Sequence, residues 1–184
     1  MKHTKQKILF LIADEIQAIN YNARNKLKIE TALNKALKEG DKIDKTIKEL
    51  VNELPQKEKE KIIILRWSDL MKSLERKQFL NELSENYNKK ENFHKGIVKI
   101  VREYTSKEKR EFSLESLHKM EKYLIEELPE FLKGILYERN YFNLYVYPKD
   151  NRFFKFVQQI QDGKIKLKLT QKLPTEKIAF VVVN

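Results

Sequence analysis

A tyrosine and a glutamate four residues apart are the first candidates for chemistry in this sequence. Tyr123 and Glu127 lie in a segment whose apolar residues recur at helical spacing, so their side chains are predicted to share one face of a helix. A carboxylate and a phenol hydroxyl can together hold or transfer a proton. The same spacing is common on ordinary amphipathic helices, where such a pair is a surface contact or caps a core tyrosine.

Two prolines mark the ends of the elements that carry these residues. Pro129 follows the pair and disfavours helical backbone just before it, so we expect the helix to break or kink there. An aromatic and β-branched run over residues 142–147 is closed by a second proline and is typical of a strand. Tyr147 is the last side chain of that strand and joins the pair as a candidate site residue.

The composition indicates a basic protein of ordinary domain size. The 184 residues contain 38 Lys and Arg against 27 Asp and Glu, a net charge of +11, and such an excess favours a polyanionic partner. A codon bias toward Lys, Ile and Asn would produce the same excess. The absence of cysteine excludes a disulfide framework, thiolate zinc sites and a thiol nucleophile, and it fits a reducing compartment.

The apolar runs of the sequence are too short to span a bilayer. The longest cover residues 8–13 and 178–183. Asp14 and Glu15 interrupt the first run before any signal-peptide cleavage site. We therefore expect a soluble, cytoplasmic protein that makes no membrane contact.

Strand and helix patterns alternate along the chain. Strands are expected at residues 7–13, 62–65, 142–147, 164–169 and 178–183. Helices are expected at about 17–38, 41–54, 88–105 and 150–161, with Gly40 as the stop of the first. Two more helices are expected, one from an N-cap at Ser68 or Asp69 through Leu83 and one from Ser113 onward. This order predicts a helix-rich α/β protein with a mainly parallel sheet, formed as a single domain over residues 1–184. Trp67 is expected to pack in the core at a strand end.

A stripe of basic residues is predicted on the first helix. Arg24, Lys28, Lys35 and Lys38 fall on the side opposite its apolar face, and Lys42 continues the stripe beyond the glycine. Such a stripe suits a phosphate backbone, and it is equally typical of a solvated helix face.

The common nucleotide and metal motifs are absent from the sequence. No GxGxxG, GxxxxGK[ST] or HExxH pattern occurs, and His3, His94 and His118 lack the spacing of metal ligands. The sequence predicts neither a metal nor a cofactor.

Five segments together resemble the cyclodipeptide synthases over nearly the whole chain. They read IADEIQAINYNAR at 12–24, ILRWSDL at 64–70, YLIEELP at 123–129, LYVYP at 144–148 and a terminal IAFVVV at 178–183. The Tyr-Pro pair at 147–148 is similar to one branch of that family. The resemblance implies a Rossmann-like, three-layer fold similar to the catalytic domain of class Ic aminoacyl-tRNA synthetases, and a monomer.

The resemblance also implies an activity and residue roles. The family forms cyclic dipeptides, 2,5-diketopiperazines, from two aminoacyl-tRNAs through an aminoacyl-enzyme. Tyr123 and Glu127 match the residues that hold the α-amino group, and Tyr147 matches the tyrosine of the proton transfers. A carboxylate pairs well with an ammonium, and removing a proton turns that ammonium into the attacking amine. The basic stripe, Arg24 to Lys38, would face the tRNA.

One feature of the family has no counterpart in this sequence. Its members carry an N-terminal strand with a GxS motif whose serine becomes acylated, whereas none of the serines here follows a glycine at two residues. We expect either an N-terminally truncated member or a degenerate paralogue. The alternative function is a catalytically inactive basic α/β module that binds tRNA or another polyanion through the same helix.

Overall fold

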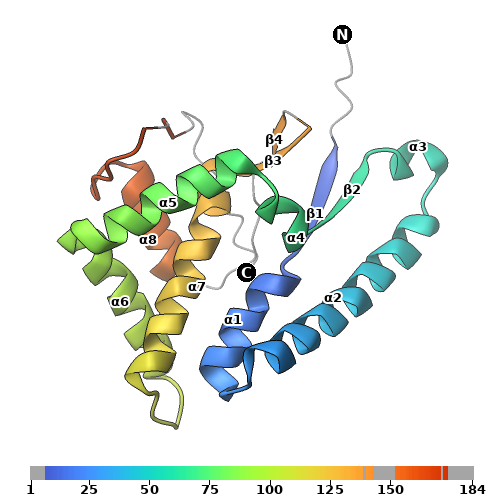
Figure 1. Cartoon of the computed structure of the whole chain (residues 1–184). Helices are drawn as coiled ribbons and strands as arrows, with labels where there is room; N and C mark the ends of the chain where they lie inside the picture. Colours follow the sequence, from blue (N-terminus) through green and yellow to red (C-terminus); the bar gives the residue numbers. More distant parts are fainter. Residues whose placement is uncertain (1–6, 139, 143–151, 171, 174–184) are drawn as a thin grey trace. The chain divides into compact units, whose positions relative to one another are not determined.

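The structure is a computed structural model that describes residues 7–138, 140–142, 152–170 and 172–173. The chain divides into two compact units, residues 1–72 and residues 73–184, and Figure 1 labels their helices and strands. Helices dominate both units, and the first also contains a small parallel sheet. The described chain is therefore a helix-rich α/β protein, as the sequence predicts.

The first unit places two parallel strands beside helices. Strand β1 (Ile8–Ile12) pairs in parallel with β2 (Ile62–Arg66), with Ile8 opposite Ile62 and Ile12 opposite Arg66. The helices between and after them are α1 (Asp14–Asn25), α2 (Ile29–Asn52), α3 (Gln56–Lys59) and α4 (Trp67–Met71). Both strands are continuous apolar runs, and the two strand predictions are confirmed.

The single helix predicted over residues 17–38 is wrong, because the chain reverses at Lys26. The φ angle of Lys26 is 54°, a left-handed conformation that ends α1, and the side-chain amide of Asn22 donates to the Leu27 carbonyl 2.6 Å away. The reversal brings buried alanines of α1 and α2 together, and their small side chains let the two helices pack closely (Figure 1).

Gly40 does not end a helix, contrary to the prediction from its lack of a side chain. The helix continues through it to Asn52 because the glycine is needed for a close approach. A Cβ at Gly40 would lie 2.6 Å from Cβ of Asp14 and 2.9 Å from Nη2 of Arg66. The glycine is thus explained by packing, and the helix predicted separately over residues 41–54 is the second half of α2.

The predicted N-cap at Ser68 or Asp69 is also wrong. Helix α4 begins at Trp67, and Ser73 caps the next helix by accepting a hydrogen bond from the Arg76 amide at 3.3 Å. Asp69 lies in the first turn of α4 and accepts from the Arg66 amide at 3.2 Å. Trp67 is buried, as predicted.

The second unit is built around one long helix. It contains α5 (Leu74–Lys89), α6 (Glu91–Thr105), α7 (Leu114–Lys133), the antiparallel pair β3 (Ile135–Tyr137) and β4 (Asn140–Phe142), and α8 (Arg152–Gln161). Helix α7 packs against α5, α6 and α8 (Figure 1). The largest fully buried side chains of this core are Phe79, Leu83, Phe93, Ile97, Leu128, Leu132 and Val157. Each stabilises the fold by about 1.5–3 kcal/mol through burial.

Helix α7 continues through Pro129, so the break, one of the two outcomes predicted there, does not occur. The helix starts after Ser113, which accepts a hydrogen bond from the Ser116 amide as expected, and it runs through the proline to Lys133. Pro129 cannot donate to the carbonyl one turn earlier, and its ring crowds that turn. In this turn the guanidinium of Arg76 donates to the Glu126 carbonyl at 2.7 Å. Leu128, Phe131 and Leu132, on both sides of the proline, are buried in the core, and this packing favours a continuous helix.

Residues 164–169 do not form the predicted edge strand, although their alternation is real. Ile165, Leu167 and Leu169 pack on the core, while the lysines between them are exposed. Their backbone is bonded by a side chain of α5: the Lys168 amide donates to Asn86 at 2.8 Å, and Asn86 donates back to the Lys168 carbonyl at 2.9 Å. The side-chain amide of Asn86 thus makes the two backbone hydrogen bonds that a neighbouring strand would make.

Two predicted strand regions lie outside the described residues. These are the end of the 142–147 strand and the terminal run at 178–183; β4 ends at Phe142. Among the described residues, no helix has the length and hydropathy that a membrane span needs.

Candidate functional site

Helix α7 presents Tyr123 and Glu127 on one face, as their spacing predicts. The Tyr123 hydroxyl donates to Oε1 of Glu127 at 2.6 Å. The opposite face of the helix, including Ile125 and Leu128, is buried in the core and fixes the orientation of the pair. Both site side chains are half-buried, so they are partly shielded from water and still reachable.

The carboxyl group of Glu127 has an unusual proton affinity. Burial raises its pKa to about 7, the hydrogen bond from Tyr123 opposes this rise, and the negative charge of Glu130 adds to it. A base works best when its pKa lies near the working pH. Glu127 can therefore bind a cation in its ionised form and can also accept a proton near neutral pH.

A buried ion pair lies next to this carboxyl group, and the sequence reasoning did not identify it. Arg76 donates through Nε to Oε1 of Glu130 at 2.7 Å, and both side chains are almost fully buried. Burial raises the pKa of Glu130, and the Arg76 guanidinium opposes that rise. A second carboxylate, Glu126, lies 3.8 Å from Nη1 of Arg76.

The sequence does contain a signal for Arg76. Phe79, Leu80 and Leu83 follow it at three, four and seven residues, so Arg76 occupies the apolar face of α5. A charge at such a position needs a buried partner of opposite sign. Its partner could not be chosen from the sequence, because several glutamates of α7 lie within two turns of one another.

The third candidate residue, Tyr147, lies outside the described residues. Its relation to the Tyr123–Glu127 pair therefore stays a prediction.

The four predicted tRNA-binding residues do not form a stripe on one helix. Arg24 lies in the last turn of α1, Lys28 is the N-cap of α2, and Lys35 and Lys38 lie within α2. The reversal at Lys26 separates Arg24 from the other three. Lys28 and Lys38 are exposed and make no ion pair with other described residues.

Lys35 is the member of this group that is engaged within the first unit. Its Nζ lies 4.0 Å from Glu39 and 4.3 Å from the centre of the Tyr21 ring. Tyr21 also donates to Glu39. An interaction of this kind reduces the positive charge that Lys35 offers to an RNA phosphate.

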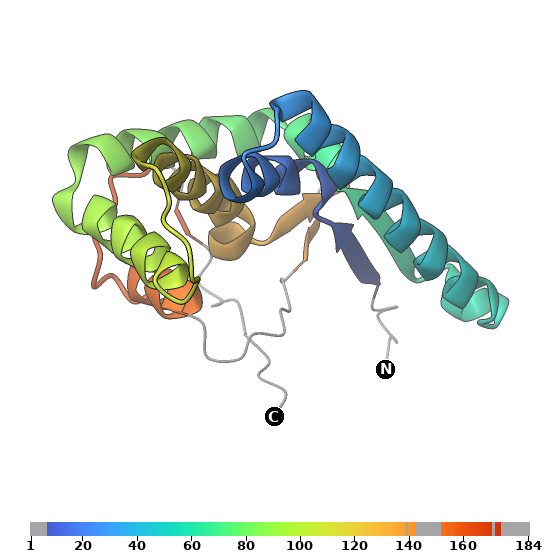
Figure 2. The ribbon, with the colours of Figure 1, turned by 90° about the horizontal axis from the view of Figure 1, so that it is seen from below.

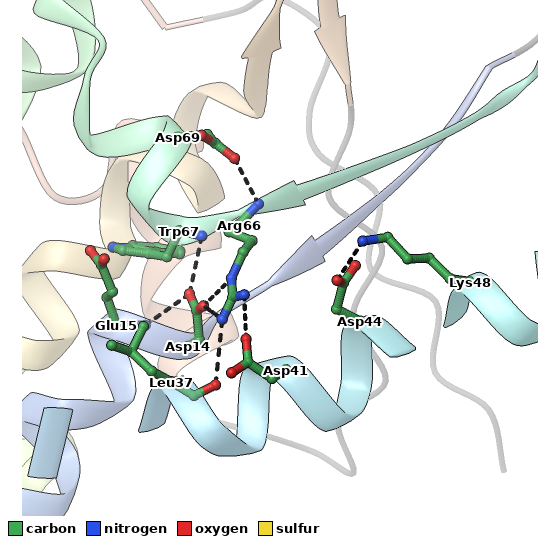
Figure 3. A network of polar contacts seen from close by, with 9 residues as sticks. All are labelled: Asp14, Glu15, Leu37, Asp41, Asp44, Lys48, Arg66, Trp67 and Asp69. Carbon is green, nitrogen blue, oxygen red and sulfur yellow. Dashed lines mark hydrogen bonds and ion pairs between the residues drawn. The ribbon is translucent and has the colours of Figure 1, made fainter. Parts of the chain in front are cut away.

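A polar network joins the carboxyl ends of the two parallel strands (Figure 3). Asp14, just after β1, accepts from Nε of Arg66 at the end of β2 at 2.6 Å, and from the Trp67 amide at 3.3 Å. Nη1 of Arg66 donates to Asp41 of α2 at 2.6 Å. The side chain of Asp14 is completely buried, so the network fixes α2 against both strands.

No cluster of three potential metal-ligating side chains occurs in the described parts of the chain. His118 lies three residues before Glu121 and contacts its Oε2 at 3.0 Å, while the hydroxyl of Tyr87 donates to the same oxygen at 2.5 Å. His94 packs on the Tyr87 ring, with 4.6 Å between the ring centres.

The fold is similar to solved structures of cyclodipeptide synthases (CDPS). The structure of a CDPS from Fluoribacter dumoffii is 18% identical, with a TM-score of 0.67, and a CDPS from Staphylococcus haemolyticus is 20% identical, with a TM-score of 0.60. Each match covers 86% of this chain and 70% of the other. No family model and no curated protein matches the sequence. The chain thus shares the helix-rich α/β fold of these two CDPS structures.

Proposed function

We propose that this protein makes a cyclic dipeptide from two aminoacyl-tRNAs through an aminoacyl-enzyme. The observation that carries the proposal is the half-buried Tyr123–Glu127 pair, whose carboxyl pKa is about 7, on a fold shared with CDPS structures. The motifs of residues 123–129 and 144–148, including the Tyr-Pro pair of one branch of the family, support the same activity.

In the proposed reaction, two amide bonds form and two ester bonds break. The first aminoacyl group passes from its tRNA to the enzyme nucleophile, whose proton ends on the ribose hydroxyl of that tRNA. Each attacking nitrogen then starts as an ammonium and loses two protons, one to a base and one to the leaving oxygen. The leaving oxygen is the ribose oxygen of the second tRNA in the first amide-forming step, and the leaving group of the cyclisation is the enzyme nucleophile, which regains its proton. Ionised Glu127 holds the ammonium and takes its first proton, while Tyr123 keeps the carboxylate in place. Tyr147 relays protons at the tetrahedral centre. We assign no residue of this chain as the acylated nucleophile.

The remaining features of the proposal follow the family. We propose a Rossmann-like, three-layer fold similar to class Ic synthetase catalytic domains, working as a single domain and as a monomer. Arg24, Lys28, Lys35 and Lys38 are proposed to contact the tRNA backbone, with no metal or cofactor in the reaction.

A product assay tests the function. The chain is incubated with aminoacyl-tRNAs, and cyclic dipeptides are detected by mass spectrometry. Glu127→Gln is expected to reduce the rate by about 10²- to 10⁴-fold, the usual contribution of a general base. Tyr123→Phe and Tyr147→Phe are also expected to lose product.

The matched control for the product assay is Glu115→Gln, which removes a carboxylate from an exposed position on the same helix. Product formation by wild type with unchanged turnover in Glu127→Gln contradicts the assigned role of Glu127. Binding of tRNA by the wild type without any cyclic dipeptide would point to the inactive module instead.

A further inference from the structure

A pocket of about 860 Å³ lies between α6 and α8, on residues that the proposed function does not use. The two helices lie side by side within the second unit (Figure 2). Residues of both helices and of the turn after α6 line the pocket, and those that matter below are Lys99, Glu103, Tyr104, Lys107, Arg152 and Lys155.

The charge of this pocket is strongly positive. Four cations line it against one carboxylate, that of Glu103, and Glu103 is ion-paired with Arg152. Lys99 and Lys107 are exposed and make no ion pair with any other described residue. At least two cations of the pocket are therefore available to a bound anion, with their charges only partly screened by salt over such short distances.

An aromatic side chain stands among these cations. Tyr104 lines the same pocket and is 49% exposed. A ring exposed beside lysines is the combination that binds single-stranded nucleic acid, because the cations hold the phosphates while a base stacks on the ring. An acidic peptide would use the cations but would bring no base to stack on the ring.

Close packing of α6 against α8 fixes the two helices that line the pocket. A Cβ at Gly96 of α6 would lie 2.1 Å from the ring of Phe156 on α8, so the two helices approach closely at this glycine. The Phe156 ring in turn stacks on Phe93, with 5.6 Å between the ring centres. A pocket with a wall fixed in this way loses little entropy on binding.

We propose that the α6–α8 pocket binds an unpaired segment of RNA, with its phosphates at Lys99 and Lys107 and one base stacked on Tyr104. The identification of tRNA as the source of this segment rests on the proposed function. The pocket would be a tRNA contact separate from the lysines of α2.

The test measures binding without catalysis, using the full chain, deacylated tRNA and a short single-stranded RNA over a range of salt concentrations. We expect Lys99→Glu/Lys107→Glu to weaken binding by at least tenfold. The slope of log affinity against log salt concentration should become shallower by about 0.7 for each single-strand phosphate that the variant no longer neutralises. Tyr104→Ala is expected to weaken binding by about tenfold, and Tyr104→Phe to retain it. The control is Lys77→Glu/Lys122→Glu, which makes the same charge change at exposed positions elsewhere in the second unit.

Equal affinity and salt slope in the pocket variant and the control would overturn the proposal. So would an equal loss of binding to heparin, a polyanion without bases, in Tyr104→Ala. Pocket-dependent binding of deacylated tRNA without any cyclic dipeptide from the wild type would support the RNA site while contradicting the proposed function. Product formation by the wild type, with RNA binding unchanged in the pocket variants, would support the proposed function and contradict the RNA site.

Discussion

Glu127 combines two properties that an amino-group binding site needs. Its carboxylate accepts a hydrogen bond from Tyr123, and its pKa of about 7 lies close to neutral pH. The pair itself could be found from residue spacing, since four residues bring two side chains together on any helix. The pKa could not, because it depends on how deeply the carboxyl group is buried. It also depends on Glu130, three residues further on, which lies beyond the helix break or kink predicted at Pro129.

The raised pKa predicts a pH-dependent stability. Folding raises the pKa of Glu127 from 4.5 to about 7, so the folded state binds the proton more tightly and loses stability as the pH rises through this window. Glu127→Gln removes the loss and keeps a group that accepts from Tyr123. We expect the variant to gain about 2 kcal/mol over wild type between about pH 4.5 and pH 8, less than the full shift because Glu127 is only half-buried.

Denaturant unfolding of both proteins at several pH values measures this difference. A difference that stays constant with pH would show that Glu127 titrates alike in the folded and unfolded states. Glu115→Gln serves again as the exposed control.

Arg76 is expected to matter for stability through its buried partner. Arg76→Met leaves Glu130 buried without its cation and removes the donor to the Glu126 carbonyl, so we expect a loss of about 3–5 kcal/mol. The double variant Arg76→Met/Glu130→Met removes both charges and is expected to recover most of this loss. Chemical denaturation compares the two, and a double variant as unstable as the single one would exclude the unpaired charge as the cause.

At the scale of helices and strands, Gly40 gives an unusual prediction. Gly→Ala in a helix interior normally stabilises by about 1 kcal/mol. At Gly40 the new methyl group would meet Asp14 and Arg66, so Gly40→Ala is expected to destabilise the protein by about 1–3 kcal/mol. Asn34→Ala, at an exposed position of the same helix, is the control for helix propensity. Thermal unfolding checks the sign, and a stabilised Gly40→Ala would contradict the close contact.

Local sequence patterns correctly predict helices and strands that are determined by apolar periodicity. They fail where contacts with residues distant in the sequence determine where a helix ends or which group pairs with the backbone. The strands at 8–12 and 62–66 and the helices after Ser73 follow from apolar periodicity. The intrinsic preferences of Gly40 and Pro129 predict a helix end and a break or kink, yet both helices continue. Asp14 and Arg66 pack closely on Gly40, and the residues on both sides of Pro129 are buried in the core. The alternation at 164–169 is present in the structure, yet its backbone partner is the side chain of Asn86 and not a strand.

At the scale of the whole molecule, the net charge of +11 matters through the cations that are available to a partner. Lys28 and Lys38 are exposed and unpaired among the described residues, whereas Lys35 contacts Glu39 and Tyr21. We expect the double variant Lys28→Glu/Lys38→Glu to weaken tRNA binding and to flatten its salt dependence. The control Lys35→Glu/Lys77→Glu reverses the same number of charges and is expected to have the smaller effect on both. Equal effects in a salt titration would remove this part of α2 from the interface.

The proposed function depends most on Glu127, as the residue that holds the α-amino group of an aminoacyl-tRNA. The most direct measurement compares binding of an unreactive amide-linked aminoacyl-tRNA with its α-hydroxyacyl counterpart, which lacks the ammonium, at a pH of about 8 where Glu127 is ionised. A hydrogen bond to a charged group contributes about 1.5–3 kcal/mol, so the wild type is expected to prefer the amino form by at least tenfold. Glu127→Gln is expected to lose this preference while Glu115→Gln keeps it. The same preference in wild type and Glu127→Gln would contradict the account.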